Sequence, residues 1–216
     1  MAANTAPKLI LASASPRRSE LLRAAGFDFE VLPASLPEVA RKGESPEQFV
    51  RRMAHEKAEA VWRKLPQPRS RPVLAADTVV VLGNQLLGKP ADAEEARAML
   101  QALSGNEHRV LTGLCLVYLL PQGPASATEP TVDVRVASTA VKFSKLTESE
   151  IQEYVNSGEP LDKAGAYAIQ GRASKYVEWV RGCYFNVVGL PVSLLYRMLR
   201  EARLIPHNND HVPSPH

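Results

Sequence analysis

The sequence contains few of the residues that mark disulfide-bonded or nucleic-acid-binding proteins. Its 216 residues include two cysteines, Cys115 and Cys183, and these form no CxxC motif. We therefore expect reduced, partly buried thiols, as in a cytoplasmic protein. The net charge is +3, with scattered basic residues, two tryptophans and five phenylalanines. Nucleic-acid-binding proteins usually carry a basic stripe with interleaved aromatic residues, so we expect no nucleic-acid partner.

Other absences exclude membrane proteins and several enzyme classes. No apolar run approaches the ~18 residues of a membrane span, and the N-terminal residues show no signal-peptide pattern. We therefore expect a soluble, cytoplasmic protein without a membrane partner. The sequence contains no GxxxxGK[ST], GxGxxG or GxSxG motif, and no histidine pair has zinc-binding or catalytic spacing.

Short apolar runs alternate with segments of helical periodicity, which predicts an α/β fold with a mixed, twisted sheet and flanking helices. The expected strands are 9–12, 27–33, 73–76, 79–82, 85–89, 110–120, 132–143, 164–170 and 176–179. The expected helices are 16–25, 45–65, 92–103, 147–157 and 191–203, with capping boxes of Ser45 with Gln48 and of Thr147 with Glu150. A slip in the apolar phase between Val136 and Val141 predicts a β-bulge. Chain length favours a single domain over residues 8–204, with two lobes around a central cleft, then a disordered tail at 205–216.

The first expected strand leads directly into a helix, and the turn between them predicts an anion site. Ser15 is a suitable N-cap for this helix. Ser13 lies beside the helix start, and Arg17 and Arg18 fall in the first turn, where the helix dipole disfavours arginine. Free backbone N–H groups, hydroxyls and guanidiniums together suit a phosphate chain. A solvated basic turn is the alternative.

Asp77 is the best candidate for a catalytic carboxylate, because it interrupts two apolar strand segments where a charge is costly unless paired or used. Such a carboxylate can hold a divalent cation or activate a water. A turn aspartate bonded to its own backbone is the alternative. Lys57, Lys89 and Glu38 are weaker candidates, since lone lysines and loop glutamates are usually solvated.

Three further polar residues have local interpretations. Gln170, beside Gly171, can present an amide to a base edge or bond the backbone. Asp162 and Lys163 can simply pair with each other. His108 follows Gly105 in an expected turn, has no evident partner and is interpreted as structural.

Seven segments, in order along the chain, resemble the motifs of the Maf family. They are SASPRR at 13–18, ADTVV at 76–80, GKP at 88–90, LSGNEH at 103–108, GEPLDKAGAY at 158–167, IQG at 169–171 and NVVGLP at 186–191. The resemblance implies a nucleoside triphosphate pyrophosphatase that yields a nucleoside monophosphate and pyrophosphate. It also implies a divalent cation (Mg²⁺ or Mn²⁺) and the fold of inosine triphosphate pyrophosphatases. A homodimer is a further implication.

The same resemblance assigns roles to individual residues. Asp77 matches the general base, and Arg17, Thr78 and Gln170 match the residues that mark the subgroup acting on dTTP and UTP. Glu38 matches an acidic loop position that helps Asp77 to hold metal. The phosphate-contacting positions match Ser13, Arg18, Lys57 and Lys89, and Ser15 is assigned to the same phosphate site from its place at the helix start.

Two departures from the family pattern, and two alternative functions, accompany these expectations. Pro37 stands where the acidic loop often carries a second acid, and Arg172-Ala173-Ser174 replaces the further glycines common after Gly171.

One alternative function is the same reaction on 7-methyl-GTP, whose subgroup differs at the position of Arg17. The other is a nucleotide-binding sensor that inhibits septum formation.

Overall fold

Three long antiparallel strands run through the middle of the computed structural model, which describes residues 8–67, 70–120 and 129–205. They are β3 (Val73–Leu82), β5 (Glu107–Tyr118) and β6 (Thr131–Phe143). The short strands are β1 (Leu9–Leu11), β2 (Phe29–Val31), β4 (Gln85–Leu87) and β7 (Val177–Arg181). The α-helices are α1 (Pro16–Ala24), α2 (Pro46–Lys64), α3 (Ala93–Leu103), α4 (Glu148–Asn156), α5 (Tyr184–Val188) and α6 (Val192–Glu201). Three 3-10 helices precede β7: η1 (Glu159–Asp162), η2 (Ala164–Ala166) and η3 (Arg172–Tyr176).

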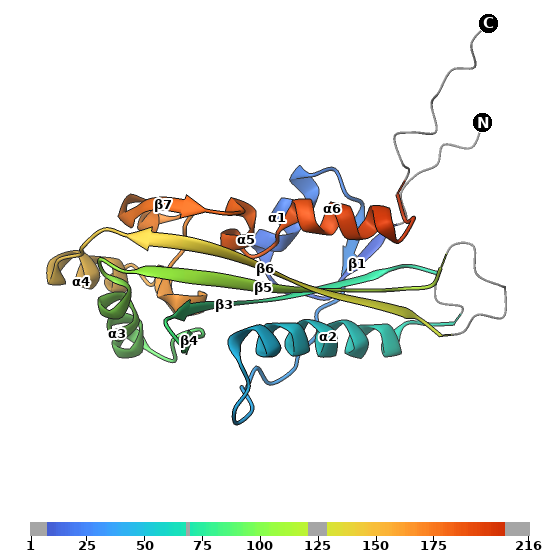
Figure 1. The fold of residues 1–216 in the computed structure, drawn as a ribbon, viewed down its shortest axis with the longest axis horizontal. Coiled ribbons are helices and arrows are strands. Elements are labelled where there is room, and N and C mark those ends of the chain that lie inside the picture. Colours follow the sequence, from blue (N-terminus) through green and yellow to red (C-terminus); the bar gives the residue numbers. More distant parts are fainter. Residues whose placement is uncertain (1–7, 68–69, 121–128, 206–216) are drawn as a thin grey trace, which may run out of the picture.

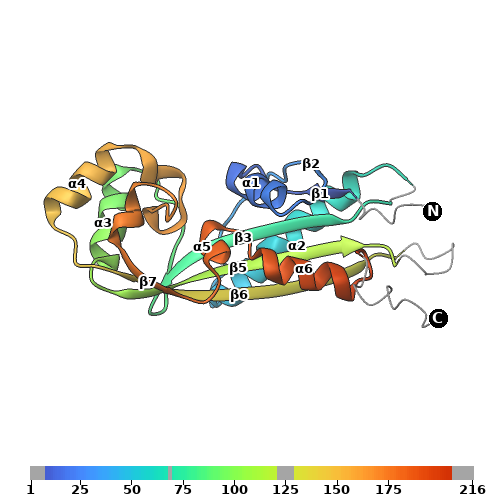
Figure 2. The same ribbon diagram turned by 90° about the horizontal axis from the view of Figure 1, so that it is seen from above.

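The strands form one seven-stranded sheet in the order β2-β1-β3-β5-β6-β7, with β4 paired to β3. β1 runs parallel to β2 and β3, and every other pairing is antiparallel. This arrangement confirms the predicted α/β fold with a mixed sheet. α3 and α4 lie together at one end of the long strands, while α1, β1 and β2 lie along the side of β3 (Figure 2).

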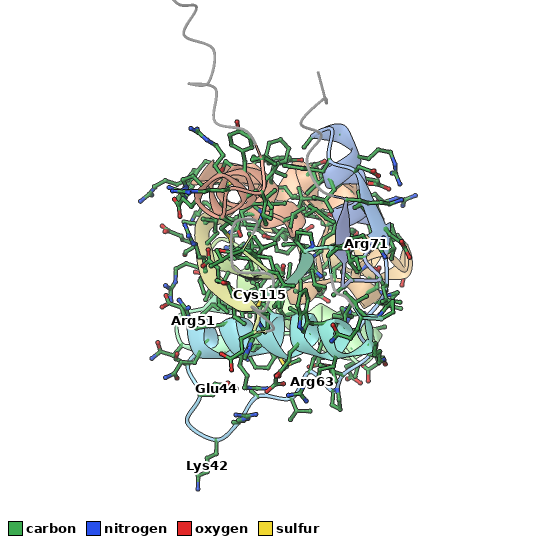
Figure 3. All side chains as sticks on the ribbon, turned by 90° about the vertical axis from the view of Figure 1, so that its right-hand side faces the viewer. Lys42, Glu44, Arg51, Arg63, Arg71 and Cys115 are labelled. Atoms are coloured by element: carbon green, nitrogen blue, oxygen red, sulfur yellow. The ribbon has the colours of Figure 1, made fainter. Side chains whose placement is uncertain are left out.

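Helices cover both faces of the sheet (Figure 1). α2 begins with the predicted capping box of Ser45 and Gln48, and it packs on one face. Its backbone comes so close to β5 that a Cβ on Gly113 would lie 2.2 Å from the Val50 carbonyl oxygen. Cys115 lies inside, between β5 and α2, whereas Lys42 points away from the molecule (Figure 3). The opposite face is covered by α1, α5 and α6 (Figure 1).

Three sequence predictions about strands are wrong. β3 is continuous through Asp77, so this residue lies within a strand and not at a strand end. β6 pairs with β5 without a bulge between Val136 and Val141; the register shift lies at Lys142/Phe143, against β7. The apolar phase changes because Val136 packs under α2, whereas Val141 packs on the opposite face of the sheet.

The segment 164–170, predicted as a strand, forms η2 and a turn. Gly165 is left-handed (φ 67°), its N–H donates to the Gly88 carbonyl, and a Cβ there would lie 2.6 Å from Val80. This close packing takes the segment out of the sheet. The tail predicted to be disordered, 205–216, lies outside the described residues except for residue 205. Most of the connection between the strands expected at 110–120 and 132–143 also lies outside them, and the two-lobe division stays a prediction.

Candidate active site

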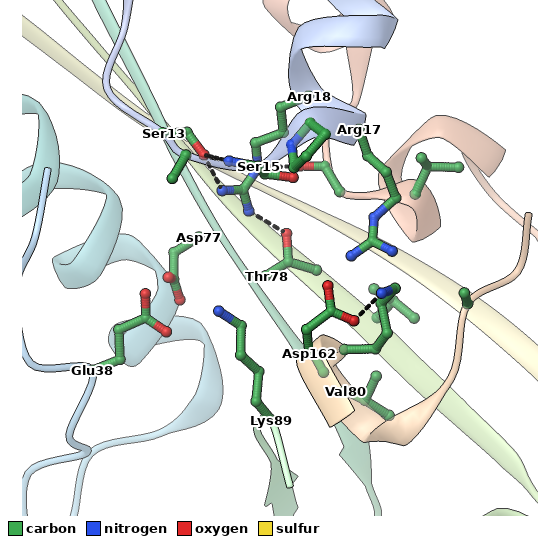
Figure 4. Close-up of a pocket in the computed structure, with 18 of the residues that line it drawn as sticks. Ser13, Ser15, Arg17, Arg18, Glu38, Asp77, Thr78, Val80, Lys89 and Asp162 are labelled. Carbon is green, nitrogen blue, oxygen red and sulfur yellow. Dashed lines mark hydrogen bonds and ion pairs between the residues drawn. The ribbon is translucent and has the colours of Figure 1, made fainter. Parts of the chain in front are cut away.

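A cavity of about 440 Å³ opens where β3 has no neighbouring strand on one edge. In the described residues, β1 pairs with β3 only at Val73 and Leu74, and β4 pairs with it from Val80 onward. The edge from 75 to 79 is therefore free of strand partners between these two. Side chains from both faces of β3 can reach one cavity there, which explains how the adjacent residues Asp77 and Thr78 both line it (Figure 4).

On the α2 face of β3, a buried lysine joins two carboxylates. The Lys57 ammonium donates to Asp77 Oδ1 and to Glu38 Oε1, each at 2.6 Å. The side chains of Lys57 and Asp77 are 8% and 5% exposed, and that of Glu38 is 43% exposed. Gly113 is the β5 partner of Asp77, and its missing side chain lets α2 bring Lys57 this close. In this arrangement the Lys57 ammonium lies between the two carboxylates, and its predicted contact with phosphate stays a prediction.

The two carboxylates respond differently to this environment. Burial raises the pKa of Asp77, and the charge and hydrogen bond of Lys57 offset only part of that effect. Burial also acts to raise the pKa of Glu38, but there the hydrogen bond and charge of Lys57 prevail and the pKa is lowered. Asp77 is thus the more basic carboxylate of the pair.

On the opposite face of β3, the Arg18 side chain links the start of α1 to β3 and to the residue after α5. Its Nε donates to the Gly189 carbonyl at 2.9 Å, and its terminal nitrogens donate to Ser13 Oγ (2.9 Å) and Thr78 Oγ1 (3.0 Å) (Figure 4). These bonds use three of the five N–H donors of a guanidinium. Ser13 Oγ also accepts from the Ser15 N–H at 3.2 Å, so its own proton is available to a ligand.

Ser15 occupies the predicted N-cap position, but its side chain makes no capping bond to the described residues. The N–H groups of the first turn of α1 therefore receive no cap from it and are available to an anion. Ser15 itself lines the cavity. The helix start thus has the properties expected of a phosphate site.

The remaining predicted residues lie around the same cavity. Lys89, exposed after β4, points toward the space beside Asp77 and Glu38 (Figure 4). Arg17 points toward the Asp162–Lys163 ion pair on the other side of the cavity (Figure 4). Gln170, which is exposed, also lines the cavity. All predicted site residues are therefore brought together, while their individual roles stay predictions.

The sequence did not identify a chain of buried hydrogen bonds that supports Thr78. Thr78 Oγ1 shares a 3.0 Å bond with Thr112 Oγ1, and Thr112 donates to the Asn186 carbonyl at 3.2 Å. The Asn186 amide donates to the Val110 carbonyl and to Thr139 Oγ1. The only sequence signal for this chain was the NVVGLP segment, whose asparagine had no assigned role.

The carboxylate pair suits a hard divalent cation. After the bonds to Lys57, one oxygen each of Asp77 and Glu38 has no partner among the described residues. No cluster of three or more His, Cys, Asp or Glu side chains with metal-binding geometry occurs in the described part of the chain. Mg²⁺ is commonly held by one or two carboxylates together with substrate phosphates and waters, so these donors fit such an ion.

The cleft of this α/β protein thus combines cationic groups at a helix start with a pair of lysine-linked carboxylates, an arrangement that suits a polyphosphate. Comparison with known proteins identifies the family. The family model described as "Maf-like protein" matches residues 8–202. The chain belongs to the Maf family.

Its relatives include two proteins named "dTTP/UTP pyrophosphatase". The one from Anaeromyxobacter dehalogenans (strain 2CP-C) is 51% identical over 197 residues, covering 91% of this chain and 95% of that protein. The one from Koribacter versatilis (strain Ellin345) is 47% identical over 198 residues, with coverage of 91% and 95%. Among solved structures, the Staphylococcus aureus Ham1 protein overlaps with a TM-score of 0.46 at 12% identity, covering 90% of this chain and 98% of that one.

Proposed function

We propose that this protein hydrolyses dTTP and UTP to the nucleoside monophosphate and pyrophosphate. The observation that carries the proposal is the juxtaposition, in one cavity, of the Lys57-linked carboxylates with the Arg18–Ser13 helix start. The names of the relatives at about half identity support the same reaction and the same substrates. Arg17, Thr78 and Gln170, the residues that mark the pyrimidine subgroup, line this cavity.

The triphosphate binds through donors at the start of α1 and through Lys89. Arg18 has two N–H donors beyond those taken by Ser13, Thr78 and Gly189, and Ser13 has a free hydroxyl proton. Burial lowers the pKa of Arg18, against the nearby carboxylates, but it remains a cation at neutral pH. These groups neutralise phosphate charge and fix the chain beside Asp77.

Asp77 accepts a proton from the attacking water. Burial raises its pKa, which makes it a stronger base than an exposed aspartate. The water oxygen forms a bond to the α-phosphorus, and the bond from that phosphorus to the bridging oxygen breaks. Pyrophosphate leaves with the electron pair of that bond. The active site mainly positions the reactants and stabilises charge.

Asp77 and Glu38 are the residues that would hold Mg²⁺ or Mn²⁺, which supplies charge neutralisation on the phosphate oxygens when bound. The Lys57 ammonium bonds one oxygen of each carboxylate, which leaves the other oxygen of each available to that ion. We expect the base to lie near Arg17, Thr78 and Gln170. A site that hydrogen-bonds a base edge rejects bases that leave its polar groups unpaired.

The reaction is tested by pyrophosphate release from UTP, dTTP, GTP and 7-methyl-GTP with Mg²⁺ or Mn²⁺, in wild type and in Asp77→Asn. We expect UTP and dTTP to be preferred, and the variant to lose roughly 10²–10⁴-fold in turnover with its fold intact. Near-wild-type activity of Asp77→Asn would refute its role as base. Preference for 7-methyl-GTP would refute the pyrimidine assignment, and tight binding without turnover would indicate a nucleotide sensor.

Two properties accompany this proposal. We propose a cytoplasmic location, as expected of an enzyme that acts on the nucleotide pool, and the homodimer implied by the family resemblance stays a prediction. Within residues 8–67, 70–120 and 129–205, no helix combines the length and apolar character needed to span a bilayer.

A further inference from the structure

Gln170 stands at the corner of a tight turn with an unbonded side chain. The turn Ala168–Gly171 is closed by the Gly171 N–H, which donates to the Ala168 carbonyl at 3.0 Å. The Gln170 side chain is exposed to the cavity and makes no hydrogen bond to another described residue. No side-chain partner holds its amide, so the backbone of the turn alone fixes the point from which this side chain reaches the cavity.

Two side chains from outside the turn hold the backbone on either side of Gln170. The Tyr154 hydroxyl, on α4, accepts from the Ala168 N–H at 3.0 Å and donates to Glu159 Oε1 at 2.8 Å. The same Oε1 accepts from the Arg172 N–H at 3.0 Å. One continuous set of bonds thus ties the first residue of the turn, Ala168, to the residue after the turn, Arg172. We call Tyr154 and Glu159 the turn clamp.

Gly171 shows how closely the clamp is packed against the turn. A Cβ at this position would lie 2.2 Å from Glu159 Oε1. The φ of Gly171 is −108°, so a larger residue here would displace the Glu159 carboxylate but would not strain the backbone. Arg172-Ala173-Ser174, which replaces the family's further glycines, forms the start of η3. The first N–H of that helix, from Arg172, donates to Glu159 Oε1.

The hydroxyl of Tyr154 is suited to this bridging role. The residue is 2% exposed. Burial raises the pKa of the phenol, which keeps the proton that it donates to Glu159. An unpaired Ala168 N–H at this buried position would be costly, so the bond restrains the turn strongly.

We infer that Tyr154 and Glu159 are positioning residues that hold the Gln170 turn and thereby set the selectivity for the base. The inference rests on the proposed function, in which Gln170 reads the base. Neither residue lines the cavity, so the clamp acts through the turn and has no contact with the substrate.

The test removes single hydroxyls from two neighbouring tyrosines. Tyr154→Phe removes the bonds of the hydroxyl to the Ala168 N–H and to Glu159 Oε1. Tyr176→Phe is the matched control, since its ring packs edge-on against Tyr154 at 5.9 Å but its hydroxyl bonds the Glu150 carbonyl and not the turn. Values of kcat and KM for UTP, dTTP and GTP are measured in each. We expect Tyr154→Phe to lower the UTP-over-GTP ratio of kcat/KM by roughly 3- to 10-fold, mainly through the KM for UTP.

Two further variants separate positioning from general stability. Glu159→Gln keeps an oxygen acceptor for the Arg172 N–H and should retain most of the selectivity that Glu159→Ala loses. In a Gln170→Ala background, Tyr154→Phe should lower the ratio no further, because the amide that the clamp positions is gone. Hydrogen exchange provides a readout independent of activity: the Ala168 amide should exchange faster in Tyr154→Phe and be unchanged in Tyr176→Phe.

The outcomes distinguish this inference from the proposed function. If Gln170→Ala changes the ratio but Tyr154→Phe leaves it unchanged, the inference is overturned and the proposed function stands. An equal loss in Tyr176→Phe, or an additive loss in the double variant, also overturns it. Absence of UTP and dTTP turnover in wild type refutes the proposed function, and the exchange measurement still reports whether the clamp holds the turn.

Discussion

Replacing Lys57 by methionine should destabilise the protein through the loss of a buried charge. The substitution leaves the Asp77 side chain, which is 5% exposed, without its cation. The Glu38 side chain is 43% exposed, so water can solvate its charge. Breaking a buried ion pair by removing one partner costs about 3–5 kcal/mol. Because a single deeply buried carboxylate is affected, we expect a loss of about 3 kcal/mol in the free energy of unfolding.

The assay is urea unfolding at neutral pH with a chelator present, so that no cation replaces the ammonium. Lys64→Met is the matched control, since it makes the same change at an exposed position near the end of α2. Exposed substitutions of this kind usually change stability by less than about 0.5 kcal/mol. In an Asp77→Asn background the cost of Lys57→Met should fall by more than half, because the stranded charge is absent. A loss in Lys57→Met within about 1 kcal/mol of the control would refute the buried ion pair.

Two further predictions concern the packing beneath the site. Burial lowers the pKa of His108 to about 4 from an ordinary 6.5, so the fold favours the neutral ring, and this contribution to stability is lost as pH falls from 6.5 toward 4. Between about pH 8 and pH 5 the loss in the free energy of unfolding is about 2 kcal/mol. In urea unfolding, the stability of His108→Gln should therefore depend less on pH than that of wild type. Equal pH dependence of the two proteins would contradict this. Gly113→Ala places a Cβ 2.2 Å from the Val50 carbonyl oxygen, so α2 must shift, and we expect a loss of about 2–3 kcal/mol with reduced pyrophosphate release. Gly88→Ala, where a Cβ meets no atom within 4 Å, is its control in the same unfolding and activity assays; equal effects would refute the close approach of α2.

Features that depend on neighbouring residues in the sequence were predicted well. The capping boxes at Ser45 and at Thr147 are present with both reciprocal bonds, because the residues that form them are three apart. The mixed sheet follows from the alternation of apolar runs and helical segments. Ser15 was correctly placed at the start of α1, but its side chain does not cap the helix.

Features that depend on tertiary approach were missed. The burial of Lys57 depends on Gly113, 56 positions further along the chain, and no periodicity in α2 reveals it. His108, expected in a turn without a partner, lies in β5 and shares a 2.9 Å bond with the Tyr167 hydroxyl. The segment 164–170 resembled a strand because small and apolar residues alternate, and its actual path is set by contact with Val80.

The candidate site was largely predicted through family motifs, with Asp77 also indicated by its apolar surroundings. What the motifs did not give is the geometry that joins them. The free edge of β3 allows Asp77 and Thr78, on opposite faces of one strand, to border a single cavity. The polar support behind that cavity, through Thr112 and Asn186, required the structure.

Hydrolysis of UTP in ¹⁸O-labelled water reports directly which phosphorus the water attacks. We expect one solvent oxygen in the phosphate of UMP and none in pyrophosphate, because the water activated by Asp77 attacks the α-phosphorus. Label in pyrophosphate, or release of inorganic phosphate with UDP, would contradict the account by showing attack at another phosphorus.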